Sequence, residues 1–372
     1  MKKNKIDKIF FGIVIALVVI GIIAFTSASL GIYAKSEAKF YGVMFGQFVF
    51  GIGGGLLALW IGLKIPYKLY RKHALILFIL SIILTALVLI PGIGESHGGA
   101  RRWINIFGYT FQPVEFLKIG FIIYFAAWLS WIKGKVKDIR FSILPLFISV
   151  GIIALVLLRQ PDTKSLILII ATGLVMLFVS GAPLKYIFGI FIVAIVGFGI
   201  LIFFKPYLME RVNTFLNPGE NSRGSSYQLQ QSLIAVGSGG ITGRGLGQSI
   251  QKFNYLPEPQ GDSIFAVIGE EMGFLGCGVL ICLYVAFALR GYRIAIRNGP
   301  DPFAKLLVIG LVTIITAQSF LNIASLIGLF PLTGVPLVFI SHGGTALLLS
   351  LGMVGIILNI SKFNGKPIID KK

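Results

Sequence analysis

The chain has 372 residues, of which 56% are hydrophobic and only 13% are charged, and its mean hydropathy is +0.90. Because a soluble domain typically carries about 25% charged residues, the composition excludes an ordinary soluble enzyme. The net charge of +19 does not indicate a nucleic-acid partner, because the basic residues are dispersed over short connecting segments. We expect the only two cysteines, Cys277 and Cys282, to be membrane-buried thiols without a disulfide.

Apolar segments of about 20 residues recur along the whole chain, and this is the length that a helix needs to cross the hydrocarbon core. We place them at 9–29, 44–63, 74–94, 114–132, 141–158, 165–182, 184–204, 263–289, 306–330 and 343–361. No stretch shows the alternation of a membrane β-barrel. The sequence therefore predicts an all-α polytopic membrane protein with about ten transmembrane helices, forming one membrane domain over residues 1–372.

The basic residues indicate the orientation, because lysine and arginine accumulate in the cytoplasmic connections of membrane proteins. Of the 33 basic residues, 21 lie on the face that carries both chain ends. Both termini are therefore expected to be cytoplasmic, where the positive charge contacts anionic membrane lipids. The first apolar segment is longer than the core of a cleavable signal peptide, so we expect it to remain as a signal anchor.

Two extracellular connections, at about 95–113 and 205–262, are long enough to carry function. The larger one lies between helices 7 and 8 and contains two stretches with the apolar spacing of short helices, 207–215 and 227–236. The glycine-rich stretch 237–247 follows them. It either presents backbone N–H groups to phosphate or serves as a flexible hinge.

Ionisable residues within apolar segments are costly and commonly mark functional sites. Glu115 and Lys118 are three residues apart on one helix face, so we expect a pair, either purely structural or lining the site cavity. Glu270 and Glu271 lie about 100° apart around a helix, and we expect one to face the cavity and the other a hydroxyl or backbone group. All four are expected in the extracellular halves of their helices.

Several motifs occur in a characteristic order. They are Gly98-Gly-Ala-Arg-Arg-Trp-Ile104, Phe111-Gln-Pro-Val-Glu-Phe-Leu-Lys118, Gln160-Pro-Asp162, Gln231-Ser-Leu-Ile-Ala-Val-Gly-Ser-Gly-Gly240, Tyr255-Leu-Pro-Glu258, Asp262-Ser-Ile-Phe-Ala-Val-Ile-Gly-Glu-Glu271, Pro331-Leu-Thr-Gly-Val-Pro-Leu337 and Ser341-His-Gly-Gly344. Over nearly the whole chain they resemble the FtsW/RodA/SpoVE (SEDS) family of peptidoglycan glycosyltransferases, with a leaning towards the FtsW branch. The chain departs from the family pattern at Thr163-Lys164-Ser165, where a Gly-Thr pair usually follows Gln-Pro-Asp.

The resemblance implies a multi-pass protein of the bacterial cytoplasmic membrane that polymerises lipid II into glycan strands at the outer face. Lipid II is a disaccharide-pentapeptide on undecaprenyl pyrophosphate. The resemblance also implies a class B penicillin-binding protein as partner and a place at the division septum. Two other functions stay open, which are a lipid II flippase and a non-catalytic scaffold for division or elongation.

Glycosyl transfer needs a base for the acceptor hydroxyl and cations for the leaving pyrophosphate. Asp262 matches the family's catalytic aspartate and is the expected base, at the extracellular mouth of the eighth helix, for an attack that inverts the anomeric centre. An aspartate directly before an apolar run is also a favoured helix N-cap. Both interpretations apply to Asp262 at this point.

The expected cations are Arg101 and Arg102, next to Trp103, with Arg244 and Lys252 as further candidates for the pyrophosphate. The two arginines and the tryptophan also fit ordinary interfacial anchors.

A divalent cation, Mg²⁺ or Mn²⁺, is a candidate cofactor, because such ions commonly bridge carboxylates and phosphates. Asp162 and Glu258 are the candidate second carboxylates beside Asp262. Ser341 begins a stretch that predicts a cap and tight turn into the last helix, with a substrate contact as the alternative.

Overall fold

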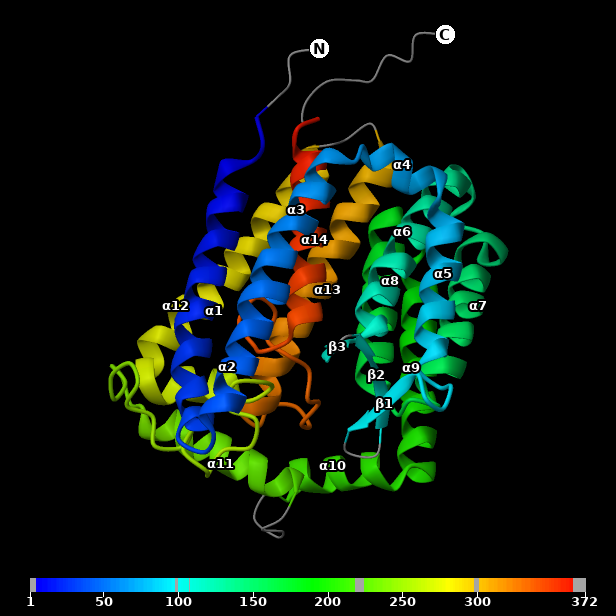
Figure 1. Cartoon of the computed structure of the whole chain (residues 1–372). Helices are drawn as coiled ribbons and strands as arrows, with labels where there is room; N and C mark the ends of the chain where they lie inside the picture. The colour runs from blue at the N-terminus through cyan, green and yellow to red at the C-terminus, as the bar shows by residue number, and fades with distance from the viewer. Residues whose placement is uncertain (1–4, 98–99, 107, 218–223, 298–300, 364–372) are drawn as a thin grey trace.

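The computed structural model describes residues 5–97, 100–106, 108–217, 224–297 and 301–363. Long helices run side by side (Figure 1), and the start of α1 (Lys8–Tyr33) lies at the same end as the finish of α14 (Gly344–Ser361). The backbone nitrogen of Asp7 donates to Ser361 Oγ at 3.1 Å. The two ends of the chain therefore lie on one side of the bundle, as an even number of crossings requires.

Within the described residues, nine helices are long and apolar enough to cross a membrane. They are α1, the continuous helix Glu37–Lys64, α6 (Pro113–Ile132), α7 (Ile139–Leu157), α8 (Thr163–Ser180), α9 (Leu184–Phe204), α12 (Ile264–Arg297), α13 (Pro302–Leu326) and α14. The predicted segment 74–94 forms only α5 (Ala74–Leu87), because turns and strand β1 follow it. Each of the ten predicted segments thus contains an apolar helix.

The second membrane helix combines α2 (Glu37–Phe45), the π-helical η1 (Gly46–Gly53) and α3 (Gly54–Lys64), and α4 (Tyr67–Lys72) follows it. It begins earlier than predicted, because Ser36 Oγ accepts from Lys39 N at 3.4 Å and caps the polar first turn. Glycines bring α3 close to α14: a Cβ on Gly62 would lie 2.8 Å from Gly352 O. Small residues of this kind let membrane helices pack closely.

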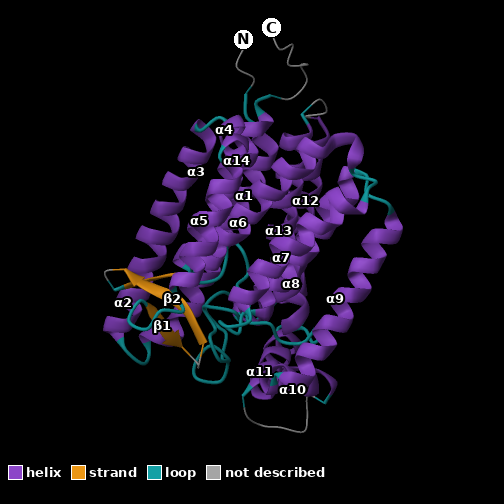
Figure 2. Ribbon diagram, turned by 90° about the vertical axis from the view of Figure 1, so that its right-hand side faces the viewer, coloured by secondary structure: helices purple, strands orange, loops and turns teal. Residues whose placement is uncertain are grey.

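The centre of the bundle is α13, most of whose side chains are buried, whereas α9 buries only Ile190 and stands apart in Figure 2. Apolar side chains cover the outer faces. Leu155, Phe188 and Phe203, for example, are 71%, 65% and 78% exposed. This surface fits hydrocarbon, which cannot solvate polar groups.

The end opposite the described chain ends carries the two long connections (Figures 1 and 2). The first connection was predicted without regular structure, but it forms an antiparallel sheet of β1 (Gly94–His97), β2 (Ala100–Ile106) and β3 (Tyr109–Phe111). The second contains α10 (Pro206–Leu216) and α11 (Ser225–Ser238), which lie across this end and confirm the two predicted short helices. Gly98 and Gly99, which open the first quoted motif, lie outside the described residues. The short 3₁₀ helix η2 (Lys133–Lys135) is in the α6–α7 connection.

The helix α12 is broken at Gly273, where φ is +64° and ψ is −163°. The glycine-rich stretch pairs with this break. Arg244 N and Gly245 N donate to the carbonyls of Glu270 and Glu271 at 3.0 Å each, and Phe274 N donates to Gly240 O at 2.9 Å. The glycines of this stretch therefore serve close backbone packing within the protein, because a Cβ on Gly239 would lie 1.9 Å from Gly269 O and one on Gly243 would lie 2.1 Å from Glu271 O.

Between α13 and α14, residues 327–343 form no regular helix or strand, although the stretch 331–341 is largely buried. We call residues 331–341 the site segment. Gly21 of α1 packs directly on its backbone, because a Cβ there would lie 2.3 Å from Phe339 O. Because the irregular stretch begins at residue 327, the helix predicted to end at residue 330 ends at Leu326.

Asp7 and Arg290 join α1 to α12 at the end with the termini. The Arg290 guanidinium contacts the Asp7 carboxylate at 2.9–3.1 Å. Burial acts to raise the pKa of Asp7, but the hydrogen bonds from Arg290 and Phe10 and the nearby positive charges lower this pKa below 3.8 overall.

Because the pKa of Asp7 is lower in the folded state, its pairing stabilises the fold above pH 3.8, and the contribution is lost as the pH falls through the folded pKa. We predict that Asp7→Asn lowers the thermal midpoint of the purified protein at pH 7. The difference from wild type should shrink below about pH 4. A difference that stays constant down to pH 3 would show that the charge of Asp7 is unimportant for stability.

Candidate active site

Asp262 lies at the end of the long connection, just before α12, and is half-buried. Its backbone carbonyl accepts from Asn322 Nδ2 at 2.8 Å, and Ser341 Oγ donates to the carbonyl of Gly261 at 2.8 Å. Its carboxylate faces Gly334, since a Cβ there would lie 3.0 Å from Asp262 Oδ2. Helix α13 and the site segment therefore fix Asp262 at the end of the bundle that carries the sheet.

Among the described residues, no backbone N–H in the first turn of α12 donates to the Asp262 carboxylate, so a capping role alone does not explain this aspartate. The carboxylate instead lies near positive groups. The charges of Asp262 and Asp162 both act on the Lys164 ammonium, and the charge of Asp262 also acts on Arg211.

Three cations gather here, because the charge of Asp262 acts on Lys164 and Arg211 and the charge of Arg102 acts on both of these cations. Each of the three donates to a backbone carbonyl. Arg102 Nε donates to Gln160 O at 3.1 Å, and Arg102 Nη2 donates to Pro161 O. Arg211 Nη1 donates to Thr333 O at 3.1 Å, and Lys164 Nζ donates to Gly334 O. A guanidinium has five N–H donors, so both arginines keep donors for a further acceptor.

Arg211 lies on α10, outside the membrane-spanning helices. Burial and then the charge of Arg102 lower the pKa of its guanidinium, while the Asp262 charge acts in the opposite direction. Arginine nevertheless stays protonated in proteins. Like charges held this close together create a positive potential that favours an anion.

Asp162 is fully buried and caps α8. Its Oδ1 accepts from Ser165 N at 3.4 Å, and its Oδ2 accepts from Ser165 Oγ at 2.8 Å. The Gln160–Asp162 motif thus starts α8 and positions Arg102 and Lys164.

The predicted Glu115–Lys118 pair is present and buried. Lys118 Nζ lies 2.7 Å from Glu115 Oε1 and 2.7 Å from Gln318 Oε1. Gln318 Nε2 in turn donates to Pro336 O in the site segment at 3.2 Å. The pair is therefore structural and supports the site through the backbone of the site segment.

The other predicted site residues are exposed or half-buried residues of the two long connections, or they support the backbone at the site. Arg101 is exposed on β2, and Trp103, half-buried, stands opposite Glu95 in the sheet register. Glu258 is exposed, and its carbonyl accepts from Ser263 N at 3.2 Å. The buried Ser341 hydroxyl donates to Gly261 and accepts from Leu337 N at 2.8 Å, so it positions the backbone beside Asp262.

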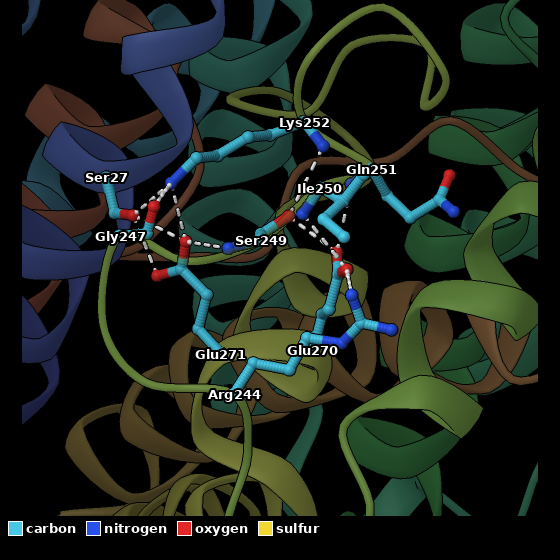
Figure 3. A network of polar contacts seen from close by, with 9 residues as sticks. All are labelled: Ser27, Arg244, Gly247, Ser249, Ile250, Gln251, Lys252, Glu270 and Glu271. Carbon is cyan, nitrogen blue, oxygen red and sulfur yellow. Dashed lines mark hydrogen bonds and ion pairs between the residues drawn. The ribbon is translucent and has the colours of Figure 1, made fainter.

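A second polar cluster, shown in Figure 3, corrects the prediction for Lys252. The Lys252 ammonium is fully buried and contacts Glu271 Oε1 at 2.7 Å, Gly247 O at 2.8 Å and Ser27 Oγ at 3.0 Å. It is therefore unavailable to a pyrophosphate. Glu271 also accepts from Ser27 Oγ at 2.7 Å and from Ser249 N at 3.3 Å, which ties α12 to α1.

Glu270, the neighbour of Glu271 on α12, also binds the loop of residues 244–252. Its carboxylate accepts from Ser249 Oγ at 2.5 Å, Ile250 N at 3.0 Å and Gln251 N at 3.2 Å, and Arg244 lies 3.5 Å away. The expectation that one of the two glutamates faces the site cavity is wrong, because both anchor the 244–252 loop. Arg244 likewise belongs to this cluster.

The cluster yields a stability prediction. Removing one partner of a buried ion pair costs about 3–5 kcal/mol, whereas removing both costs less. We expect Lys252→Met and Glu271→Gln each to lower the thermal midpoint strongly and the double variant to recover part of the loss. Lys185→Met, which removes an exposed lysine, is the matched control. Additive losses in the double variant would show that the two charges do not depend on each other.

The predicted divalent cation can be compared with the side chains that the described residues bring together. They contain no group of three His, Cys, Asp or Glu side chains that could hold a metal ion. Both oxygens of Asp162 bind Ser165, and an ammonium group, Lys164, stands near Asp162 and Asp262.

Sequence reasoning missed Lys164, Arg211, Gln318 and Asn322 as site residues. The signal for Lys164 was present, because a cation two residues after Asp162, at the start of an apolar segment, is unusual. Asn322 and Gln318 lie four residues apart on α13, hence on one helix face. Nothing local indicated that this face meets an irregular segment.

The fold and the site define a polytopic membrane protein with a cluster of charged groups at the end away from its termini. Residues 7–366 match the FTSW_RODA_SPOVE family, described as cell cycle protein. The chain belongs to this family. Stage V sporulation protein E of Bacillus subtilis is 36% identical over 365 residues, which are 98% of this chain and 99% of that protein.

Other relatives agree. A protein of Trichlorobacter lovleyi named probable peptidoglycan glycosyltransferase FtsW is 38% identical over 355 residues, 95% of this chain and 93% of that protein. A chain of a solved peptidoglycan synthase complex matches with a TM-score of 0.78 and 26% identity, over 96% of this chain and 97% of that one. The rod shape determining protein RodA of Thermus thermophilus shares the fold, with a TM-score of 0.71 at 24% identity over 97% and 98% of the chains.

Proposed function

We propose that this protein is a peptidoglycan glycosyltransferase that polymerises lipid II at the outer face of the cytoplasmic membrane, with Asp262 as the general base. The observation that carries the proposal is the Asp262 carboxylate near Lys164 and Arg211, on both of which the charge of Arg102 also acts, at the end of the bundle away from the termini. Relatives named as FtsW glycosyltransferases support the reaction class.

The reaction needs a carboxylate and an anion site next to each other. In the proposed step, the acceptor hydroxyl transfers its proton to Asp262 as its oxygen forms a bond to the anomeric carbon of the donor. The bond from that carbon to the pyrophosphate oxygen breaks, and undecaprenyl pyrophosphate leaves with the electron pair. Attack opposite the leaving group inverts the anomeric centre.

The remaining donors of Arg102 and Arg211 stabilise the charge that develops on the leaving pyrophosphate, as preorganised donors do in other transferases. Arg101 and Trp103 on β2 and Glu258 in the loop are proposed to contact the substrate at the rim. Gln260 Oε1, Asn322 Oδ1 and Thr333 Oγ1 are buried without a hydrogen-bond partner among the described residues.

The proposed partner is a class B penicillin-binding protein, and the proposed place of action is the division septum. The solved neighbour belongs to a complex that coordinates polymerisation and crosslinking. The similarity to FtsW relatives supports division.

A lipid II flippase and a non-catalytic scaffold are the competing functions. A flippase has to pass a polar headgroup through the cytoplasmic half of the bundle. The charged groups around Asp262, and the Glu115–Lys118 pair at the start of α6, lie instead towards the end that carries the sheet. This position favours chemistry at the outer face.

Polymerisation of purified lipid II by the reconstituted protein with its transpeptidase partner tests the proposal. We predict glycan strands from the wild type, and a loss of about 10²–10⁴-fold for Asp262→Ala, because general-base catalysis typically contributes that much. Glu37→Gln, which removes an exposed acid of α2, should retain activity.

Equal activity of Asp262→Ala and wild type would remove Asp262 from the chemistry and direct attention to Glu115 and Glu258. A complex that contains the bound partner and forms no polymer with either protein would contradict the polymerase proposal and favour transport or scaffolding.

A further inference from the structure

We propose that the Lys164 ammonium is the resident cation of the site, which holds Asp262 in place so that glycosyl transfer by this protein does not depend on a divalent cation. The inference rests on the proposed function. Lys164 is assigned as a positioning residue that acts through Asp262 and the site segment.

The position of Lys164 carries the inference. It lies in the first turn of α8 with its ammonium directed at the site segment, where Nζ donates to Gly334 O. A Cβ at Gly334 would lie 3.8 Å from Lys164 Nζ and 3.0 Å from Asp262 Oδ2. The ammonium and the carboxylate therefore flank the same backbone position.

Charge balance explains why an ammonium is needed here. Both Asp262 and the fully buried Asp162 act on Lys164, whereas of these two acids only Asp262 acts on Arg211. Uncompensated buried charge is costly. A divalent cation commonly fills this role between carboxylates, but Asp162 already uses both oxygens to cap α8, and Lys164 supplies the positive charge.

A purely structural explanation is that Lys164 only satisfies the Gly334 carbonyl. The two explanations differ in what a lost ammonium does. A structural lysine would change stability, and activity with it, independently of added metal. A resident cation would leave a vacancy beside Asp262 that Mg²⁺ or Mn²⁺ can compensate in part.

The test measures lipid II polymerisation by the reconstituted complex in EDTA and over a titration of MgCl₂ or MnCl₂. We expect the wild type to vary less than about threefold across these conditions. Lys164→Gln should lose roughly 10²-fold in EDTA, because a small misplacement of a reacting group costs that much. Added Mn²⁺ or Mg²⁺ should restore about tenfold of this loss, and Lys164→Arg should retain most of the activity in EDTA.

The matched control is Lys205→Gln, which removes an exposed lysine between α9 and α10 and should behave as wild type. Thermal midpoints of all variants separate folding from function. A wild type that is inactive in EDTA and activated by Mg²⁺ would overturn the inference while leaving the proposed function intact. So would a Lys164→Gln variant whose loss is the same at every cation concentration. Absence of polymer from the wild type under all conditions would instead refute the proposed function.

Discussion

An irregular, buried backbone inside an apolar bundle imposes the main constraint on this structure. Hydrocarbon offers no hydrogen bonds, so every buried carbonyl of the site segment needs a donor from the protein. Five carbonyls receive one each, from side chains on four different helices. Thr333, Gly334, Val335, Pro336 and Val338 accept from Arg211, Lys164, Asn322, Gln318 and Tyr284.

These donors account for the presence of charge at this depth. Arg211 and Lys164 satisfy carbonyls and at the same time lie near Asp262, so the requirement for backbone partners and the requirement for a cationic site are met by the same side chains. Asn322 likewise serves both the site segment and Asp262, because its amide nitrogen donates to Val335 O and to Asp262 O. Rigid elements thus hold the proposed reacting carboxylate, as preorganised catalysis requires.

The break in α12 meets the same requirement that buried backbone groups have hydrogen-bond partners. The carbonyls freed at Gly273 find N–H donors in the glycine-rich loop, and the two buried glutamates fasten that loop. The glycine-rich loop precedes Asp262 along the chain, and the site segment lies beside Asp262 in space. Each of these two irregular segments is fixed by buried polar groups. This arrangement leaves the described backbone around Asp262 firmly supported.

Sequence alone predicted the apolar helices, the position of both chain ends on one side of the bundle, and Asp262 and Asp162 as acids of one charged site. These features depend on local hydropathy, on charge distribution and on the family resemblance. The three-stranded sheet was missed, because its strands are short and lie in a polar connection. The prediction that one glutamate meets a hydroxyl or backbone group is confirmed by Glu270. The role predicted for Lys252 and the prediction that the other glutamate faces the cavity were wrong, because helical spacing shows which face a side chain takes and does not show which distant loop covers that face.

The most direct test of the account is a structure of the protein with undecaprenyl pyrophosphate, the proposed leaving group, bound in lipid nanodiscs. The account predicts pyrophosphate density within hydrogen-bonding distance of Arg102 and Arg211, with the Asp262 carboxylate facing the side on which the sugar would be attached. Pyrophosphate bound at Arg244 or at the cytoplasmic end of the bundle, away from Asp262, would contradict it.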